Sequence, residues 1–343
     1  MIGPMAGRRS FRWIIFKRMI NVVITVFGIM TLNFLLIHLM PGDPIANVIP
    51  KDPKFNPQLK VDLTKKFHLD RPIWEQYAAY IYNTVRLDWG ISYKVTNGKV
   101  FDIIMSDMKW TLLLVGTSTM ITIAIGMVMG AYAAYRRGGV FDVGSTGFSL
   151  FLYGMPTFWF AILLQILFTT HPLGIDWWPQ LPPNGYWDVD TFGGRFEWNI
   201  PMILSVLKYL ILPSTVLAIG SIAGVSLIMR SSLIDVMTED FILTARAKGL
   251  TDYQVLRRHA LPVGMPPMIA LIAMDIAFII GGAYQVEYIF NYPGIGYRTI
   301  QSIDNLDFPI LQFIVVIGGV AVVLANFLSD ILLIYTDPRI RIA

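Results

Sequence analysis

The amino-acid sequence predicts an all-α integral membrane protein. Of its 343 residues, 55% are hydrophobic and 15% are charged, and six long windows are nearly free of charged side chains. A soluble domain usually carries about 25% charged residues. The high hydrophobicity excludes intrinsic disorder, and the absence of cysteine excludes disulfides and thiol chemistry. The net charge of +4 is not gathered into a basic block, which favours membrane lipid over nucleic acid as a partner.

Six windows have the length and composition of membrane spans. A helix that crosses a bilayer needs roughly 20 mostly apolar residues. The windows are 19–42, 110–135, 143–175, 210–229, 265–284 and 310–334. The first ends in a Pro-Gly-Asp-Pro turn, so its helix is predicted over 19–40, and the third has a loop-like tail from His171. All six are expected to be helices, because open strands cannot satisfy their backbone polar groups in lipid.

The first window has a basic start and an apolar centre, which a cleavable signal peptide also has. This window is longer than the apolar centre of a signal peptide. No small-x-small cleavage site precedes Pro41. A retained transmembrane helix is therefore the preferred interpretation.

Lysine and arginine are distributed unevenly over the two sides that six spans define. The basic residues of the tails and loops on one side are Arg8, Arg9, Arg12, Lys17, Arg18, Arg136, Arg137, Arg230, Arg246, Lys248, Arg257, Arg258, Arg339 and Arg341. Two loops on the other side hold only Arg195, Lys208 and Arg298. The positive-inside rule therefore places the tails 1–18 and 335–343 in the cytoplasm of a multi-pass plasma- or inner-membrane protein.

The segments between the windows define the remaining organisation. Residues 41–108 are mixed polar and aromatic and predict a small extracellular helical region. Residues 109–334 are predicted to form a five-helix core that includes a cytoplasmic loop, 230–264. Gly126-x3-Gly130 and Gly220-x3-Gly224 allow close contact between helices, and packing within one subunit is favoured over a seam between subunits.

The cytoplasmic loop 230–264 is predicted to contain two short helices. Asp240 is suited to be the N-cap of a helix over 241–248, and Gly249 to be the C′ residue that ends it. Thr251 and Gln254 fit a capping box that begins a second helix, which Leu261-Pro262 would end. Helical spacing puts Phe241, Thr244, Ala245 and Lys248 on one face. From this pattern alone, an ordinary amphipathic connector remains as good an interpretation as a docking helix.

The run Asp-Phe-Ile-Leu-Thr-Ala-Arg-Ala-Lys-Gly-Leu at 240–250, followed by His-Ala-Leu-Pro at 259–262, resembles the EAA loop of binding-protein-dependent ABC importers. Two details depart from the motif, since Leu243-Thr244-Ala245 replaces Glu-Ala-Ala and His259 replaces isoleucine. Five further stretches resemble the oligopeptide/dipeptide-permease B-type family. They are Met-Pro-Gly-Asp-Pro (40–44), Leu-Asp-Arg-Pro (69–72), Pro-Thr-Phe-Trp (156–159), Tyr-Pro-Gly-Ile-Gly (292–296) and Asp-Pro-Arg (337–339). The resemblance covers essentially the whole chain.

This resemblance implies the six-helix type I ABC importer permease fold. It implies a pore shared with a second homologous permease, two cytoplasmic ATPase subunits and an extracellular solute-binding protein. The residues implied in coupling to the ATPase are Asp240, Leu243, Thr244, Ala245, Arg246, Lys248, Gly249, Leu250, His259, Leu261 and Pro262.

Catalytic functions find no support in the sequence. The one Gly-Lys pair, at 98–99, has Tyr93 where a P-loop needs its first glycine, so ATP hydrolysis is expected in separate subunits. The four histidines have no metal-ligand spacing, and nothing marks Asp275 and Asp330 as a catalytic dyad. No metal or cofactor is expected. A secondary transporter would require inverted repeats and would leave the EAA-like loop unexplained.

The substrate is expected to be a di- or oligopeptide, as the resemblance implies. Relatives with similar motifs carry oligosaccharides or nickel, and both alternatives stay open. Asp275 lies near the centre of the fifth window, where a carboxylate is costly and usually faces a bundle interior or a watery cavity. We expect it to line the substrate path. The alternative is a purely structural role, paired with Lys208 or a hydroxyl.

Overall fold

The computed structural model describes residues 11–39, 71–92, 94, 98–169, 179–193, 196–197 and 199–336. Over this part of the chain the regular elements are helices, and one isolated bridge joins Ile91 to Lys99. The prediction of an all-α protein is confirmed. Residues 41–70, 93 and 95–97 of the predicted extracellular region 41–108, and the tails 1–10 and 337–343, lie outside the described residues.

The helices follow one another along the chain. Their bounds are α1 Phe11–Leu39, α3 Ile73–Val85, α4 Val100–Tyr135, α5 Val140–Tyr153, α6 Thr157–Thr169, α7 Val189–Phe192, α8 Ile200–Val236, α9 Asp240–Ala247, α10 Asp252–Val255, the π-helix η1 Leu256–Ala260, α11 Leu261–Gly264, α12 Pro266–Gly281, α13 Tyr284–Ile289, α14 Ile295–Asp304 and α15 Phe308–Thr336.

Four of the described helices, α1, α4, α8 and α15, are long and apolar enough to cross a bilayer. A fifth candidate is the pair α5 and α6, which is bent by 100°. The window 143–175, predicted as one span, therefore contains two helices with a bend between them. Pro156 explains the bend, because a proline disfavours the helical conformation in the residue before it.

The fifth predicted window corresponds to α12, which has 16 residues. At about 1.5 Å per residue it is roughly 24 Å long, shorter than a hydrocarbon core of about 30 Å. Gly282 ends it with φ at +84°, and α13 begins at Tyr284, inside the predicted window. A second glycine packs directly against this turn, since a Cβ on Gly296 would lie 2.7 Å from the backbone of Tyr284.

The other helices extend beyond their predicted windows. α1 begins at Phe11 instead of residue 19, and α8 covers 200–236 instead of 210–229. α4 begins at Val100, so this helix includes 100–108 of the region predicted over 41–108 as well as the window 110–135. Windows free of charge underestimate such helices, because charged side chains near the helix ends find partners on neighbouring helices.

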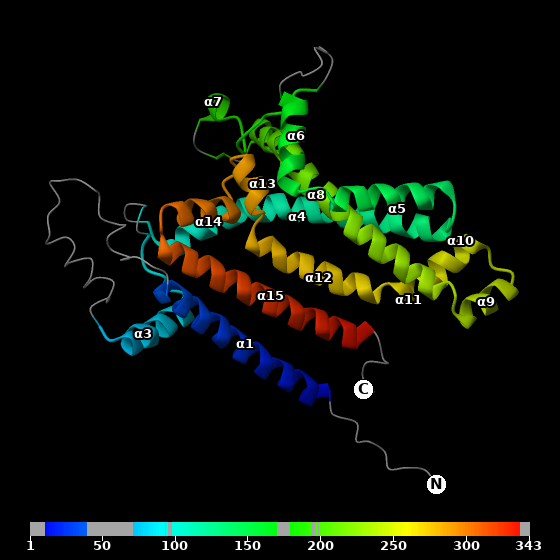
Figure 1. The fold of residues 1–343 in the computed structure, drawn as a ribbon, viewed down its shortest axis with the longest axis horizontal. Coiled ribbons are helices and arrows are strands. Elements are labelled where there is room, and N and C mark those ends of the chain that lie inside the picture. The colour runs from blue at the N-terminus through cyan, green and yellow to red at the C-terminus, as the bar shows by residue number, and fades with distance from the viewer. Residues whose placement is uncertain are drawn as a thin grey trace, which may run out of the picture.

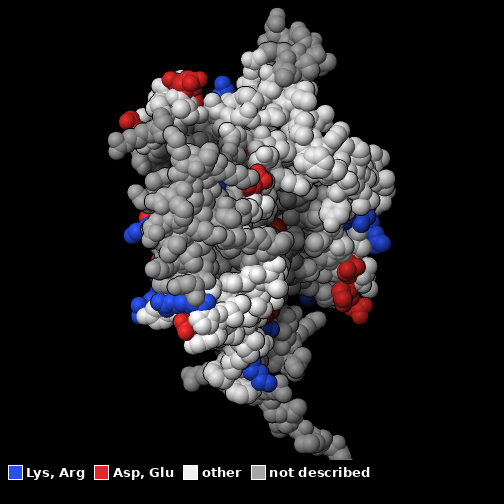
Figure 2. Space-filling model, turned by 60° about the vertical axis from the view of Figure 1, so that its left-hand side comes forward, with Lys and Arg blue, Asp and Glu red and all other residues white. Residues whose placement is uncertain are grey.

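Figure 1 shows how these helices are arranged. α1, α4, α8, α12 and α15 run along one another, and α6 runs across them. α1 begins and α15 ends at the same end of the bundle, where α9 and α10 also lie; we call this the α9 end. α3 and α14 lie at the opposite end, which we call the α3 end. Figure 2 shows a face where charged residues occupy a few separate places and other residues cover most of the described surface.

α4 and α8 approach each other most closely at two glycines of α4. A Cβ on Gly126 would lie 2.7 Å from the Val225 Cβ, and a Cβ on Gly130 would lie 2.8 Å from the Met229 Cβ. The predicted packing of Gly126-x3-Gly130 within one subunit is confirmed. The same expectation is wrong for Gly220-x3-Gly224, where a Cβ at either position would meet no described atom within 4 Å.

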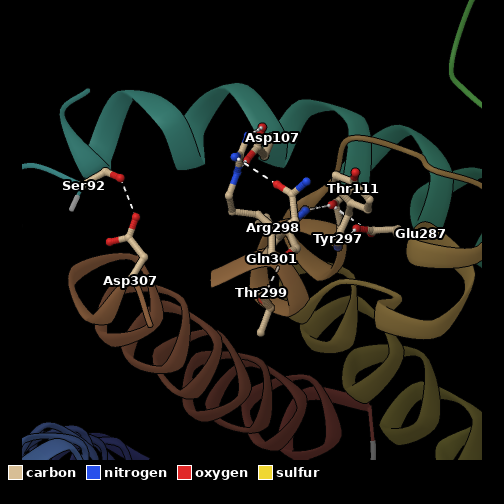
Figure 3. A network of polar contacts seen from close by, with 10 residues as sticks. Ser92, Asp107, Thr111, Glu287, Tyr297, Arg298, Thr299, Gln301 and Asp307 are labelled. Atoms are coloured by element: carbon tan, nitrogen blue, oxygen red, sulfur yellow. Dashed lines mark hydrogen bonds and ion pairs between the residues drawn. The ribbon is translucent and has the colours of Figure 1, made fainter. Parts of the chain in front are cut away.

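Ion pairs and hydrogen bonds attach α14 and its flanking loops to α4 and to the bridge at Ile91 (Figure 3). Arg298 donates from Nε to Asp107 Oδ2 at 2.6 Å, which joins α14 to α4. Ser92 donates its hydroxyl to Asp307, the residue that precedes α15. Asp107 and Asp307 are both buried. Pairing satisfies carboxylates that would be costly to bury alone.

Glu287 of α13 is fully buried and accepts several hydrogen bonds. Its Oε1 accepts from Thr111 Oγ1 at 3.0 Å and from Ala283 N at 3.1 Å, and its Oε2 accepts from Tyr297 N at 3.0 Å. Thr111 Oγ1 also accepts from Ile295 N at 2.7 Å. The carboxylate therefore caps the N-terminus of α14, where the helix dipole favours negative charge.

Burial raises the pKa of the Glu287 carboxyl, and the hydrogen bonds that it accepts oppose this effect. The folded-state pKa therefore lies above the unfolded one. This group favours the folded state at low pH, and its contribution is lost as the pH rises through the raised value.

The α4–α8 contact predicts a stability difference between two glycines of the same helix. Gly130→Ala should lower the free energy of unfolding by about 1–3 kcal/mol, because the added methyl overpacks the contact with Met229. The measurement is thermal unfolding of the purified protein in detergent. Gly116→Ala is the matched control, because its Cβ would meet nothing within 4 Å. Equal melting temperatures for the two variants would contradict the prediction.

Candidate functional site

The candidate site is the segment 240–264 at the α9 end, and its local structure follows from its caps. Glu239, not Asp240 as predicted, is the N-cap of α9. Gly249 is in the left-handed region at φ +83°, as predicted for a C′ residue. Leu250 N donates to Ala245 O at 3.4 Å and Gly249 N donates to Arg246 O at 2.9 Å. These two bonds form a Schellman motif, which ends α9 sharply.

The second short helix begins with the predicted capping box. Gln254 N donates to Thr251 Oγ1 at 3.3 Å, and Thr251 N donates to Gln254 Oε1 at 3.0 Å. An exposed ion pair between Arg246 Nε and Asp252 Oδ1, at 3.2 Å, joins α9 to α10. The turn between the two helices is therefore held from both sides.

The sequence predicted that Leu261-Pro262 would end this second helix, and that prediction is wrong. α10 continues through the π-helix η1 into α11, which runs to Gly264. Leu261 N donates to Leu256 O, five residues earlier, in place of the usual four. The wider turn changes the hydrogen-bond register just where proline lacks an N–H group, so the chain stays helical.

One face of α9 is buried within the chain itself. Ile242 and Ala245 are 1% and 4% exposed. They belong to a core with Met229 and Leu233 of α8 and with Met268 of α12. The other buried members of this core are Ala134 of α4, Val225 of α8, and Val255, Leu256 and Ala260 of the following helix. α9 is therefore fixed to the ends of the long helices.

The predicted docking face of α9 needs one correction. Ala245 lies on the buried side, so this residue is not available to a partner in this structure. Phe241, Thr244 and Lys248 are exposed, as a docking face requires. Helical spacing identifies residues on one face but not which face is buried. Ile242, which sequence reasoning missed, has the apolar side chain that could have indicated it.

The remaining predicted coupling residues divide by exposure. The exposed ones are Asp240, Leu243, Arg246, Gly249 and Pro262. Leu250, His259 and Leu261 are half-buried. Leu243 is the most exposed large apolar side chain of α9, at 69%. The structure therefore leaves an outer face of α9 with apolar, polar and basic side chains free.

Asp275 lies on α12 and is half-buried. Among the described residues it forms no hydrogen bond or ion pair, so the alternative of pairing with Lys208 is not seen. Asp330 differs, because it pairs with Arg18 and so joins α15 to α1. In the described part of the chain, no group of three His, Asp or Glu residues could hold a metal ion.

Comparison with known proteins identifies the fold and the family. A family described as "Binding-protein-dependent transport system inner membrane component" matches residues 126–342. The chain belongs to this family. The dipeptide transport system permease protein DppB of Escherichia coli (strain K12) is 32% identical over 339 residues, which cover 95% of this chain and 98% of the relative. The oligopeptide transport system permease protein AppB of Bacillus subtilis (strain 168) is 32% identical over 327 residues, with 95% and 98% covered.

A solved structure supports the same fold. The chain of the MetNI methionine ABC transporter in an inward-facing conformation matches with a TM-score of 0.51 and 15% identity. The match covers 69% of this chain and 97% of that chain. The predicted type I permease fold is therefore confirmed.

Membership of this family establishes the general role of the chain. It is a multi-pass inner-membrane permease component of a binding-protein-dependent ABC importer, and it is a transport subunit, not an enzyme. Such a system includes an ATPase and a binding protein as partners. The segment 240–264 lies within the matched residues.

The geometry of Gly249 predicts a defect in transport. Gly249→Val should reduce uptake by about tenfold, because a left-handed conformation costs an L-residue about 1–2 kcal/mol and a β-branched one more. The measurement is substrate uptake by cells or proteoliposomes that contain equal amounts of the protein. Gly249→Asn is the matched control, since asparagine tolerates this conformation and nothing lies within 4 Å of a Cβ there. Normal uptake with the valine variant would contradict the expectation that transport needs the left-handed turn at Gly249.

Proposed function

We propose that this chain forms, with a second homologous permease, the pore of an ABC importer for di- or oligopeptides. Two ATPase subunits drive the pore from the α9 end, and a solute-binding protein delivers the peptide at the α3 end. The observation that supports this assignment most directly is α9, whose inner face is packed into the core of the bundle and whose outer face is free.

Orientation follows from the positive-inside rule. The α9 end carries Arg136 and Arg137 after α4, and Arg257 and Arg258 in η1. We place this end, with both termini, in the cytoplasm. The ATPases then meet α9 on the side where ATP is available.

Outer residues of α9 act as the docking surface in this proposal. Leu243 and Thr244 contact the ATPase, and Lys248 adds positive charge at the end of the helix, next to the Gly249 turn. Ala245 and Ile242 transmit force inward, because they are buried in the core that includes the end of α8 and do not face the partner. A rigid-body movement of α9 is thereby passed to the long helices.

Peptide is the substrate class that we assign. The two relatives described above carry dipeptide and oligopeptide transport in their names, and each matches the chain over 95% of its length. In the proposed substrate path, Asp275 of α12 provides a carboxylate that forms no ion pair with a described side chain. Such a group suits the positively charged amino terminus of a peptide.

The test is transport by the complete complex in proteoliposomes. The binding protein and labelled peptides are placed on the α3 side, and ATP on the α9 side. We expect uptake of di- or oligopeptides that requires both the binding protein and ATP. Uptake of oligosaccharide or nickel in place of peptide would correct the substrate class. Uptake independent of ATP would overturn the importer assignment and indicate a secondary transporter.

A further prediction concerns Asp275. Asp275→Asn should leave assembly intact and lower peptide transport or change the preference among peptides, because the fixed negative charge is lost. The measurement is a competition series of peptides with free and acetylated amino termini. Asp330→Asn is the control, because that carboxylate is already paired with Arg18. Wild-type rates for every peptide with the Asp275 variant would rule out the pore-lining role.

A further inference from the structure

Asp142 is a buried carboxylate at the corner between α4 and α5. Its side chain is 3% exposed, in the first turn of α5. Gly138 N donates to its Oδ2 at 2.8 Å. Gly138 is in the left-handed region at φ +78° and precedes the N-cap Gly139. Asp142 therefore fixes the shape of the α4–α5 turn.

Arg230 of α8 binds the same carboxylate with two donors. Its Nη2 donates to Oδ2 at 2.9 Å, and its Nε donates to Oδ1. The guanidinium is 27% exposed. A two-point, charge-assisted contact of this kind fixes orientation as well as distance. α8 and the α4–α5 turn are thus joined at a defined angle.

The position of Arg230 on α8 connects this pair to the coupling segment. Met229 precedes it directly and Leu233 lies three residues later, and both belong to the same buried core as Ile242 and Ala245 of α9. The end of α8 therefore lies between two partners. Apolar contacts join it to α9, and the ion pair joins it to the α4–α5 turn.

α5 leads from this turn towards the α3 end. It continues through the 100° bend into α6. Gln165 of α6 donates from Nε2 to Pro183 O at 2.7 Å, and Gly185 N donates to Phe290 O at 2.8 Å, directly after α13. Elements at both ends of the molecule are therefore joined through α5 and α6 (Figure 1).

We propose that Arg230 and Asp142 form a positioning pair that makes the α4–α5 turn, and with it α5 and α6, follow the movement of α9. This inference rests on the proposed function. Without the pair, the shared apolar core still holds α9 near the end of α8, but the α4–α5 turn loses its fixed orientation on α8, so α5 follows the movement of α8 less closely. ATP hydrolysis continues and the yield of transport falls.

The experiment measures peptide transported per ATP hydrolysed by the complete complex in proteoliposomes. Arg230→Gln and Asp142→Asn should each lower this ratio by about fivefold or more, the lower end of typical coupling between sites, with unchanged copurification of the ATPases. The exchanged variant Arg230→Asp with Asp142→Arg should recover most of the ratio. Arg230→Lys should recover only part of it, because an ammonium lacks the planar fork.

Single variants leave one charge unpaired and can fold poorly, so a neutral double variant tests the proposal independently. Arg230→Gln with Asp142→Asn removes both charges, and we expect a low ratio from a normally assembled complex. Asp330→Asn, which breaks an ion pair between α1 and α15, should leave the ratio unchanged.

Two results would separate a structural role from the proposed one. If the variants reduce the amount of assembled complex but each complex transports at the wild-type ratio, the pair is only structural and the proposal is overturned. A wild-type ratio in the neutral double variant would also overturn it. If the wild-type complex itself shows no ATP-dependent transport, the failure lies in the proposed function and not in this pair.

Discussion

Ion pairs between charged residues of different helices are a main constraint on this structure. The long helices carry Asp107, Asp142, Arg230 and Asp330, each within or next to a predicted span. An unpaired charge in such surroundings is very costly, so each of these residues has a partner on another helix. The same bonds that satisfy these charges also join particular helices to one another. Asp107 attaches α14 to α4, Asp142 attaches α5 to α8, and Asp330 attaches α15 to α1.

Apolar contacts pack the helices closely over a large area, which single ion pairs do not do. The glycines Gly126 and Gly130 bring α4 against α8, and the inner face of α9 continues the same packing beyond the end of α8. α8 has 37 residues and is roughly 55 Å long at about 1.5 Å per residue. A packed core does not deform continuously. Displacement of α9 is therefore expected to move the attached helices as one body.

Some features of the site could be predicted from single residues. The left-handed Gly249 and the capping box of Thr251 and Gln254 depend on local chemistry, and the sequence predicted both. The buried face of α9 could not be predicted in this way, because Ile242 and Ala245 are buried by residues that are distant in sequence. Pro262 misled the prediction, because a π-turn removes the conflict that proline usually causes in a helix.

In the fold as well, some features could be predicted from the local sequence and others depend on distant residues. Gly154 and Pro156 are local signals of the α5–α6 bend, but the prediction of the spans used only the absence of charged residues. The early start of α4 had no such signal. Asp107 looks like a residue of a polar loop until Arg298, nearly 200 residues later, is placed beside it. Helix ends that depend on long-range ion pairs cannot be located from a window of sequence.

Two carboxylates, Glu287 and Asp275, differ in whether the described residues donate hydrogen bonds to them. Glu287 is fully buried and has no basic partner among the described residues, but Thr111, Ala283 N and the N-terminus of α14 donate hydrogen bonds to it. Asp275 lies in the middle of α12, where backbone N–H groups are used within the helix and offer no donor. Among the described residues it has no other donor. A group that the described residues do not satisfy is available to water, to the second permease or to the substrate. In the proposed importer, we expect the α12 face that bears Asp275 to border the pore shared with the second permease.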